Sequence, residues 1–413
     1  MNILMLGRWV PPVRCPVRGT REYQFARYLA RSHQLTLAFV TDNRDSAGPI
    51  SVLRSDFGDL EFAVVPRGWQ SLFSALRLVG GESCTLSYSR SEALRTRLAD
   101  RVKTTPYGLV FVTSASMIQY ALEMDPAVPV VVDFGDVESE WWRRQSERGA
   151  FPGARFFHAE ATRLRLAEAA SARRASRCFV ATATAAAVVR GLAPEAAVTV
   201  LPSGLDPECF GPGLRSGKGP TIVFNGSLAD DDDVQDLREF CRTVLPRVRA
   251  RVPGTRLVVT GRERAVTARM PMLPEVEFVA PGTDALQHFH AQTVAVAPLR
   301  AAPESRDLLV EPMAAAVPVV ATAKACEQLG ARAGHDLQVA DDPAEFALQV
   351  IGLLESEALR RELGDRGRRF VETNLSWDAH GAQLGKALAG IIGGPARPPS
   401  APPGNPLAAA EKR

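Results

Sequence analysis

The chain has 413 residues, 46% of them hydrophobic and 23% charged, which is enough for two globular domains with separate cores. Its formal net charge is only +3, and its arginines are spread along the chain, so a nucleic-acid partner is not expected. The six cysteines stand far apart without a Cys-x-x-Cys pair, which argues against a zinc site or a disulfide framework and favours the reducing cytoplasm.

The N-terminal segment predicts a buried strand over Ile3–Leu6. Its apolar run is too short for a signal peptide and no basic residues precede it. No uninterrupted apolar stretch approaches the roughly 20 residues of a membrane-spanning helix. Any membrane contact is therefore expected to be peripheral, at the inner face of the membrane.

The first half of the chain alternates apolar runs with helical patterns, which is typical of a doubly wound α/β domain. Helices are expected over Arg21–Ser32 and Arg155–Arg177. Strands are expected at Leu35–Val40, Phe62–Val65, Leu109–Val112, Val128–Val132, Cys178–Ala181 and Val198–Leu201. The first predicted domain is residues 1–202.

A Pro/Gly-rich linker follows, and the strand Thr221–Phe224 restarts the same alternation. Further strands are expected at Arg256–Thr260, Val276–Val279, Thr293–Ala297 and Val317–Ala321, with a helix at Pro343–Leu354. We predict a second Rossmann-like domain over 203–375 and a terminal helix over 376–392. The Pro-, Gly- and Ala-rich residues 393–413 lack large apolar groups and predict a disordered tail.

The segment from Asp307 to Thr322 joins an acidic helix start to a short buried strand through small residues. In parallel sheets ligands bind beyond the carboxyl ends of the strands, next to helix starts. Glu311 is therefore placed to accept hydrogen bonds from a ribose. The alternative is that Glu311 only stabilises the helix start, where acidic residues are common.

These residues carry a resemblance to a known family. Glu311-x-Met-Ala-x-x-x-Pro-Val-Val-Ala-Thr, preceded by Val294-Ala-Val-Ala-Pro-Leu-Arg300, resembles the nucleotide-binding segment of family-4 retaining glycosyltransferases of the GT-B fold. Segments 86–91, 110–120, 130–141, 201–206 and 375–378 are similar to the branch of sugar transferases associated with PEP-CTERM and exopolysaccharide export. The resemblance extends from residue 1 to about residue 392. It implies two Rossmann-like doubly wound domains facing across a cleft.

The resemblance also implies a function. A sugar would pass from a nucleotide diphosphate sugar to the hydroxyl of a glycan, a lipid-linked molecule or a small molecule, with retention of configuration. The nucleotide sugar would be a substrate, and neither a metal nor another cofactor is expected. Bacterial polysaccharide or natural-product biosynthesis is the expected setting.

On the donor side, the loop after Thr221–Phe224 contains Gly226 and Ser227, which are predicted to line the nucleotide sugar. The family typically has an arginine at the position of Ser227 and a lysine near Asp232, and both cations are missing. The Asp230–Asp233 run has three interpretations: capping of a helix from Val234, contact with a cationic acceptor, or, least favoured, a metal-binding DxD motif. The branch usually retains a lysine where this chain has Leu308.

Other residues are candidates for the missing phosphate contacts. Arg262 and Arg306 follow predicted strands, and Arg can bind phosphate with two hydrogen bonds; Arg300 has a weaker claim. Gly19 resembles the glycine that lets the loop after the first strand approach the donor. Its neighbours Arg18 and Arg21 are assigned to the acceptor side. Each arginine could instead be a solvated surface residue.

Acids and an aromatic residue are the candidates for catalysis and acceptor binding. Glu304 lies one residue from the expected position of the first glutamate of the family's pair. Asp136 stands where the family has an acid after its histidine, and that histidine is replaced by Gly135. Asp133 could orient an acceptor hydroxyl, and Trp141 could stack on a sugar. The alternatives are a turn-stabilising aspartate and a core aromatic residue.

Two other functions stay open at this stage. The missing cations, histidine and first glutamate also fit a catalytically degenerate GT-B protein that acts as a partner or scaffold. A peripheral-membrane assembly protein of polysaccharide export would need a basic, apolar face on the first domain.

Overall fold

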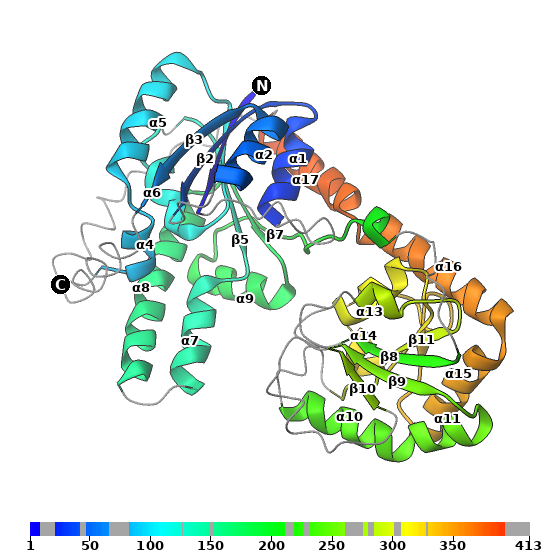
Figure 1. The fold of residues 1–413 in the computed structure, drawn as a ribbon. Coiled ribbons are helices and arrows are strands. Elements are labelled where there is room, and N and C mark those ends of the chain that lie inside the picture. Colours follow the sequence, from blue (N-terminus) through cyan, green and yellow to red (C-terminus); the bar gives the residue numbers. More distant parts are fainter. Residues whose placement is uncertain are drawn as a thin grey trace. The chain divides into compact units, whose positions relative to one another are not determined.

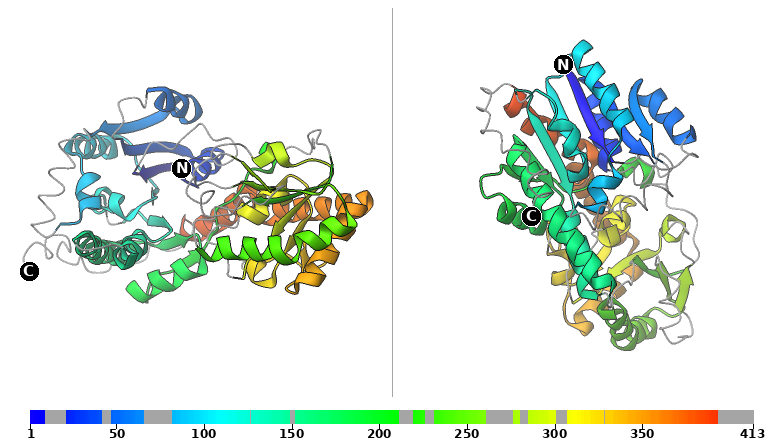
Figure 2. Two further views of the ribbon diagram at one scale, coloured as in Figure 1. Left: turned by 60° about the horizontal axis from the view of Figure 1, so that its bottom comes forward. Right: turned by 90° about the vertical axis from the view of Figure 1, so that its left-hand side faces the viewer.

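The computed structural model describes residues 1–8, 21–41, 47–65, 82–125, 127–148, 152–210, 219–225, 231–260, 276–279, 285–300, 307–327 and 329–392. They form two compact units. The first holds Met1–Gly204 and the described residues from His380 onward, and the second holds Leu205–Ala379. In each unit helices lie on both faces of one parallel sheet (Figures 1 and 2).

The first unit is built on a seven-stranded sheet in the order β3-β2-β1-β4-β5-β6-β7, in which every pairing is parallel. Its strands are β1 Asn2–Gly7, β2 Gln34–Thr41, β3 Asp59–Val64, β4 Leu109–Val112, β5 Val130–Gly135, β6 Arg177–Val180 and β7 Val198–Val200. The chain runs outward from β1 to β2 and β3, and then returns to the other side of β1 with β4. Strand order therefore reverses between β1 and β4.

Helices cover this sheet, and several begin at a side chain that caps them. Ser91 accepts a hydrogen bond from Leu94 N at the start of α5, and Thr182 accepts one from Ala185 N at the start of α9. The helices are α1 Arg21–Ala30, α2 Ala47–Phe57, α4 Cys84–Tyr88, α5 Glu92–Thr104, η3 Ala115–Met117, α6 Ile118–Ala121, α7 Glu138–Arg148, α8 Gly153–Arg174 and α9 Ala183–Leu192.

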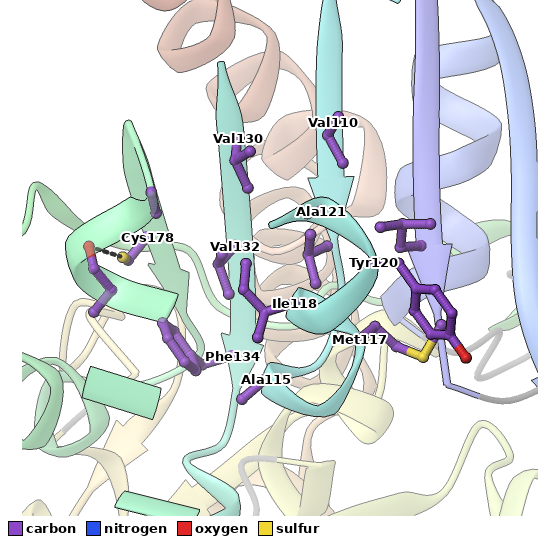
Figure 3. Close-up of a cluster of buried hydrophobic side chains, with 14 of the residues drawn as sticks. Val110, Ala115, Met117, Ile118, Tyr120, Ala121, Val130, Val132, Phe134 and Cys178 are labelled. Carbon is purple, nitrogen blue, oxygen red and sulfur yellow. Dashed lines mark hydrogen bonds between the residues drawn. The ribbon is translucent and has the colours of Figure 1, made fainter. Parts of the chain in front are cut away.

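The core of the first unit forms because its central strands are buried on both faces. All four residues of β4, Leu-Val-Phe-Val, are buried. Figure 3 shows Val110 of β4 beside the strand that carries Val130 and Val132 of β5, with Ile118 of the segment after β4 next to Val132 and Met117 next to Tyr120. This packing fixes the strand ends from which the candidate site is built.

The second unit has a six-stranded parallel sheet in the order β10-β9-β8-β11-β12-β13. Its strands are β8 Thr221–Asn225, β9 Arg256–Thr260, β10 Val276–Val279, β11 Thr293–Ala297, β12 Val319–Ala321 and β13 Gln338–Val339. Its helices are η4 Pro207–Phe210, α10 Asp231–Thr243, α11 Leu245–Arg251, η5 Ala285–His288, α13 Asp307–Ala314, α14 Ala323–Cys326, α15 Pro343–Glu355 and α16 Glu357–Asn374. The order reverses between β8 and β11.

The last helix, α17 (Trp377–Ile392), begins in the second unit, and its residues from His380 on belong to the first. Gly381 lies against the ring of Tyr28 on α1, where a Cβ would come within 2.7 Å of Tyr28 Cε2. Glycine therefore permits the close approach of the two helices.

The predicted fold class, two Rossmann-like doubly wound α/β domains, is confirmed. Several predicted boundaries are wrong. The helix expected over Arg155–Arg177 is Gly153–Arg174, and the strand expected at Val128–Val132 is Val130–Gly135. The helix expected from Val234 begins at Asp231, so Asp231–Asp233 occupy its first turn. A residue in a first turn needs no partner for its own backbone N–H within the helix, so an acidic run can be helical as well as capping. Among the described residues, no helix combines the length and apolarity required to span a membrane.

Candidate active site

A polar cluster lies at the carboxyl edge of the first sheet, where strand order reverses. Arg8 directly follows β1, Ser114 follows β4, and Glu138 opens α7 after β5. Arg8 Nη1 donates to Glu138 Oε1 over 3.1 Å, and Ser114 Oγ donates to the same oxygen over 3.2 Å. Reversal points of open parallel sheets are where ligands bind.

The second carboxylate oxygen of Glu138 has no hydrogen-bond donor among the described residues. Glu138 Oε2 is buried and accepts no hydrogen bond, whereas Oε1 is held by two donors. The side chains of Arg8 and Glu138 are 23% and 28% exposed, so the pair lies close to the surface. A hydroxyl of a bound molecule would satisfy this oxygen. The sequence alone did not predict this cluster, although each residue follows a predicted strand.

Two predicted acceptor residues, Arg21 and Asp133, are brought together as a bidentate ion pair. Arg21 Nε lies 2.6 Å from Asp133 Oδ2 and its Nη2 lies 2.8 Å from Oδ1. Arg21 Nη1 also donates to the carbonyl of Leu201 over 2.6 Å. The two side chains are 10% and 2% exposed. The pair thus ties the start of α1 to the ends of β5 and β7.

The carboxyl edge of the second sheet is held by a similar pair. Asp236 on α10 is 5% exposed; it accepts hydrogen bonds from the backbone N–H of Arg300 over 2.7 Å and from Arg300 Nε. Arg300 follows β11 next to the reversal point, and its side chain is 68% exposed. Asp236 therefore orients the guanidinium of Arg300 at the carboxyl edge of the second sheet. Sequence position alone gave Arg300 a weak claim.

Glu311 lies in the second turn of α13 and is 5% exposed. Leu308 in the same helix is also buried, at 7%. The C-terminal end of α13 is fixed from outside, because Arg368 Nη1 on α16 donates to the carbonyl of Ala314 over 2.7 Å. Glu311 is thus mounted on a rigid element rather than on a loop.

Comparisons with known proteins agree with this arrangement. Residues 219–356 match the family described as glycosyl transferases group 1. Sucrose-phosphate synthase from Thermosynechococcus elongatus is similar with a TM-score of 0.60 and 15% identity over 95% of this chain and 100% of that one. A glycosyltransferase from Rickettsia africae gives 0.59 and 11% over 95% and 98% of the two chains. Anabaena HepE, in complex with UDP and glucose, gives 0.56 and 13% over 95% and 100%.

The chain has the GT-B fold. The segment matching group 1 glycosyltransferases lies within the second unit and includes β8, β11, α13 and α15. A match of this kind on a GT-B fold supports sugar transfer as the chemistry of the protein. No curated protein sequence matches the chain.

The other described candidates lie between β5 and α8 of this GT-B chain. Asp136 is exposed in the turn between β5 and α7. Trp141 on α7 is 52% exposed and meets Trp142 edge-on at a centroid distance of 4.9 Å. Trp141 is thus a surface residue, which leaves it accessible to a ligand.

Seven predicted site residues lie outside the described residues: Arg18, Gly19, Gly226, Ser227, Arg262, Glu304 and Arg306. Their assignments stay predictions. The capping interpretation of Asp230–Asp233 likewise rests on side chains outside the described set. Within the described parts of the chain, no group of three or more His, Cys, Asp or Glu side chains is placed to hold a metal ion.

A buried carboxyl positions Glu138 in the candidate site. Glu168 on α8 is 1% exposed and accepts hydrogen bonds from Ser139 N, over 2.9 Å, and from Ser139 Oγ. Ser139 is the residue after Glu138, so Glu168 fixes the first turn of α7. Burial raises the pKa of Glu168 from 4.5 to about 7, and the two hydrogen bonds from Ser139 oppose this rise.

This pKa predicts a pH-dependent stability. Because the pKa is raised in the folded state, Glu168 stabilises the fold most below pH 4.5, and this contribution is lost as the pH rises through about 7. The free energy of unfolding should therefore fall by up to about 3 kcal/mol over this range. Glu168→Gln should remove the decrease, whereas Glu92→Gln, an exposed acid of α5, should keep it. Denaturant unfolding near pH 5 and near pH 8 gives the free energy of unfolding of each variant. An equal decrease between the two pH values in Glu168→Gln and in the unmutated protein would contradict the assignment.

Proposed function

We propose that this protein transfers a sugar from a nucleotide diphosphate sugar to the hydroxyl group of a glycan, lipid-linked or small-molecule acceptor. Transfer proceeds with retention and without a metal, in the bacterial cytoplasm, within polysaccharide or natural-product biosynthesis. The observation that carries the proposal is the match of residues 219–356 to group 1 glycosyltransferases in a GT-B chain. The similar structure of HepE with UDP and glucose supports a nucleotide sugar as the donor. The motifs support family 4 and its export-associated branch.

In this proposal the second unit binds the donor. Glu311 accepts a hydrogen bond from the ribose, and Arg300, oriented by Asp236, adds positive charge at the reversal point between β8 and β11. Positive charge there stabilises the diphosphate as it leaves. Further donor contacts are assigned to Gly19, Gly226, Ser227, Arg262 and Arg306. Glu304 and Asp136 are assigned to catalysis.

The first unit binds the acceptor. The unsatisfied oxygen of Glu138 accepts a hydrogen bond from an acceptor hydroxyl, while Arg8 and Ser114 hold the carboxylate in place. Arg18 and Trp141 contribute from neighbouring segments. Arg21 and Asp133 have a structural role in this proposal, because their polar groups are already paired with each other. They shape the acceptor side by fixing the start of α1.

The experiment that tests sugar transfer is a panel of nucleoside diphosphates and nucleotide sugars. Binding is measured first by calorimetry, and release of the nucleoside diphosphate is then followed by mass spectrometry with and without simple sugars as acceptors. Binding of one nucleotide sugar followed by acceptor-dependent release supports the proposal. Binding of no member of the panel would overturn it.

Replacing Glu311 tests the donor site directly. If Glu311 holds the ribose through a charge-assisted hydrogen bond, Glu311→Gln should weaken nucleotide affinity by roughly 1.5 to 3 kcal/mol, or tenfold or more. The variant preserves side-chain volume, so the melting temperature should change little. Glu345→Gln, an exposed acid at the start of α15, is the matched control and should bind normally. Unchanged affinity in Glu311→Gln would remove Glu311 from the donor site.

A second candidate function is a catalytically degenerate GT-B protein that acts as a partner or scaffold. The buried Leu308 favours it, because the related branch usually has a lysine at this position and a buried leucine cannot contact a phosphate. Tight nucleotide binding without turnover of any donor would favour this function over transfer.

A further inference from the structure

The hairpin of α7 and α8 carries a cluster of four aromatic rings, contributed by the first half of α7 and the start of α8. Trp142 lies 6.1 Å from Phe156 and 5.6 Å from Phe157, and Phe156 and Phe157 lie 5.7 Å apart. Trp141 extends the cluster edge-on against Trp142. The outer rings face solvent, since Trp141 is 52% and Phe156 is 37% exposed. Contiguous exposed aromatic side chains indicate a binding surface.

The stretch of chain that carries these rings is also basic. Residues 141–158 contain four arginines and one glutamate, a net charge of 4 − 1 = +3, which equals the net charge of the whole chain. Arg144 on α7 and Arg155 on α8 are both exposed. We call the exposed residues Trp141, Arg144, Arg155 and Phe156 the aromatic tip.

We propose that the aromatic tip docks the first unit on an anionic lipid surface. Trp and Phe rings are favourable at the depth of lipid headgroups, and arginines bind lipid phosphates. The rings pack on one another before binding, so little side-chain entropy is lost on insertion.

The size of the exposed patch favours a lipid surface over a protein partner. Figure 1 shows α7 and α8 running side by side and extending beyond the strands of their sheet. The aromatic tip comprises four residues, whereas a stable protein interface has about 20 to 30 residues on each partner. Exposed rings next to positive charge can insert among headgroups without a complementary groove. This surface role does not depend on sugar transfer.

Vesicle co-sedimentation of the full chain tests the proposal. Binding to phosphatidylcholine vesicles should rise when phosphatidylglycerol is included and should fall with added salt. Trp141→Ala and Phe156→Ala should each lower the partition coefficient about tenfold, because each ring loses about 1.4 kcal/mol of apolar burial. Arg144→Glu with Arg155→Glu should abolish the preference for phosphatidylglycerol.

Matched controls lie elsewhere on the chain. Among the described residues, Leu348 on α15 is the most exposed large apolar side chain at 67%, and Leu348→Ala should bind vesicles normally. Arg173, 58% exposed at the other end of α8, is the charge control as Arg173→Glu. Circular dichroism and melting temperature establish that each variant is folded.

Two results would overturn the proposal. The first is an unmutated protein that stays in the supernatant with phosphatidylglycerol vesicles at low salt. The second is vesicle binding that is unchanged in the Trp141→Ala, Phe156→Ala double variant. If that double variant instead loses turnover with a soluble sugar acceptor while vesicle binding persists, the aromatic tip belongs to the acceptor site.

Discussion

Replacing Asp133 by Ala should lower the free energy of unfolding of the first unit by about 3 to 5 kcal/mol. Asp133 is 2% exposed and accepts both of the short hydrogen bonds that Arg21 donates to it. Its removal leaves the guanidinium of Arg21, itself 10% exposed, beside the apolar ring of Phe25 without its counter-charge. The free-energy cost of an unpaired buried charge is larger than the net stabilisation from the buried pair. The loss of stability should therefore exceed the loss caused by breaking an exposed ion pair.

Calorimetry of the full chain measures this loss as a lower melting temperature for the first unit. The double variant Arg21→Met, Asp133→Ala should regain part of the stability, because it removes the unpaired charge. Breaking the exposed Lys103–Asp100 pair through Asp100→Ala is the control and should cost under about 1 kcal/mol. If Asp133→Ala melts like the unmutated protein yet loses acceptor turnover, Asp133 contacts the acceptor rather than Arg21 alone.

The fold followed from the sequence because parallel strands buried on both faces appear as short apolar runs. Leu109–Val112 and Thr293–Ala297 were predicted with the bounds that the structure gives to β4 and β11. Linkers rich in Pro and Gly separated such runs into two repeats of strand and helix. Local pattern was therefore sufficient for the class of fold.

The candidate site was less predictable because it depends on strand order. Arg8, Ser114 and Glu138 are far apart in sequence and meet only because β4 lies between β1 and β5. A sequence shows which polar residues follow strands, but not which strands are neighbours. Arg21 and Asp133 were chosen by position alone, and their mutual pairing across 112 residues was not visible.

Buried carboxylates were also missed. Glu168 appears in an Arg- and Ala-rich helix that looks like a solvated surface element. Glu160 on the same helix is fully buried and accepts hydrogen bonds from Ser83 Oγ, Cys84 N and Thr85 N at the start of α4. Both acids cap helices that are distant in sequence, so no local capping pattern reveals them.

Replacing Gly364 by Ala should lower the stability of the second unit by about 3 kcal/mol and weaken nucleotide binding with it. Gly364 on α16 lies against the turn after α13, where an added Cβ would be 2.9 Å from the carbonyl carbon of Ala316 and closer still to its oxygen. That carbonyl cannot rotate away, because Ala316 is held at a φ of 57° with its N–H bonded to Met313 O over 3.0 Å. Either α16 or the end of α13 must shift.

The shift would reach the donor site, because α13 also carries Glu311. Nucleotide affinity of Gly364→Ala should therefore fall with stability, whereas Glu311→Gln should lower affinity alone. Gly352 on α15 is the matched control: apart from its chain neighbours and the backbone of its own helix, no atom of the described residues lies within 4 Å of its added Cβ. Gly352→Ala should therefore gain about 0.5 to 1 kcal/mol from helix propensity. Thermal unfolding and nucleotide titration of both variants decide the matter. If Gly364→Ala is as stable as Gly352→Ala, the contact between α16 and the turn after α13 tolerates an added methyl group. The position of Glu311 would then depend on other neighbours.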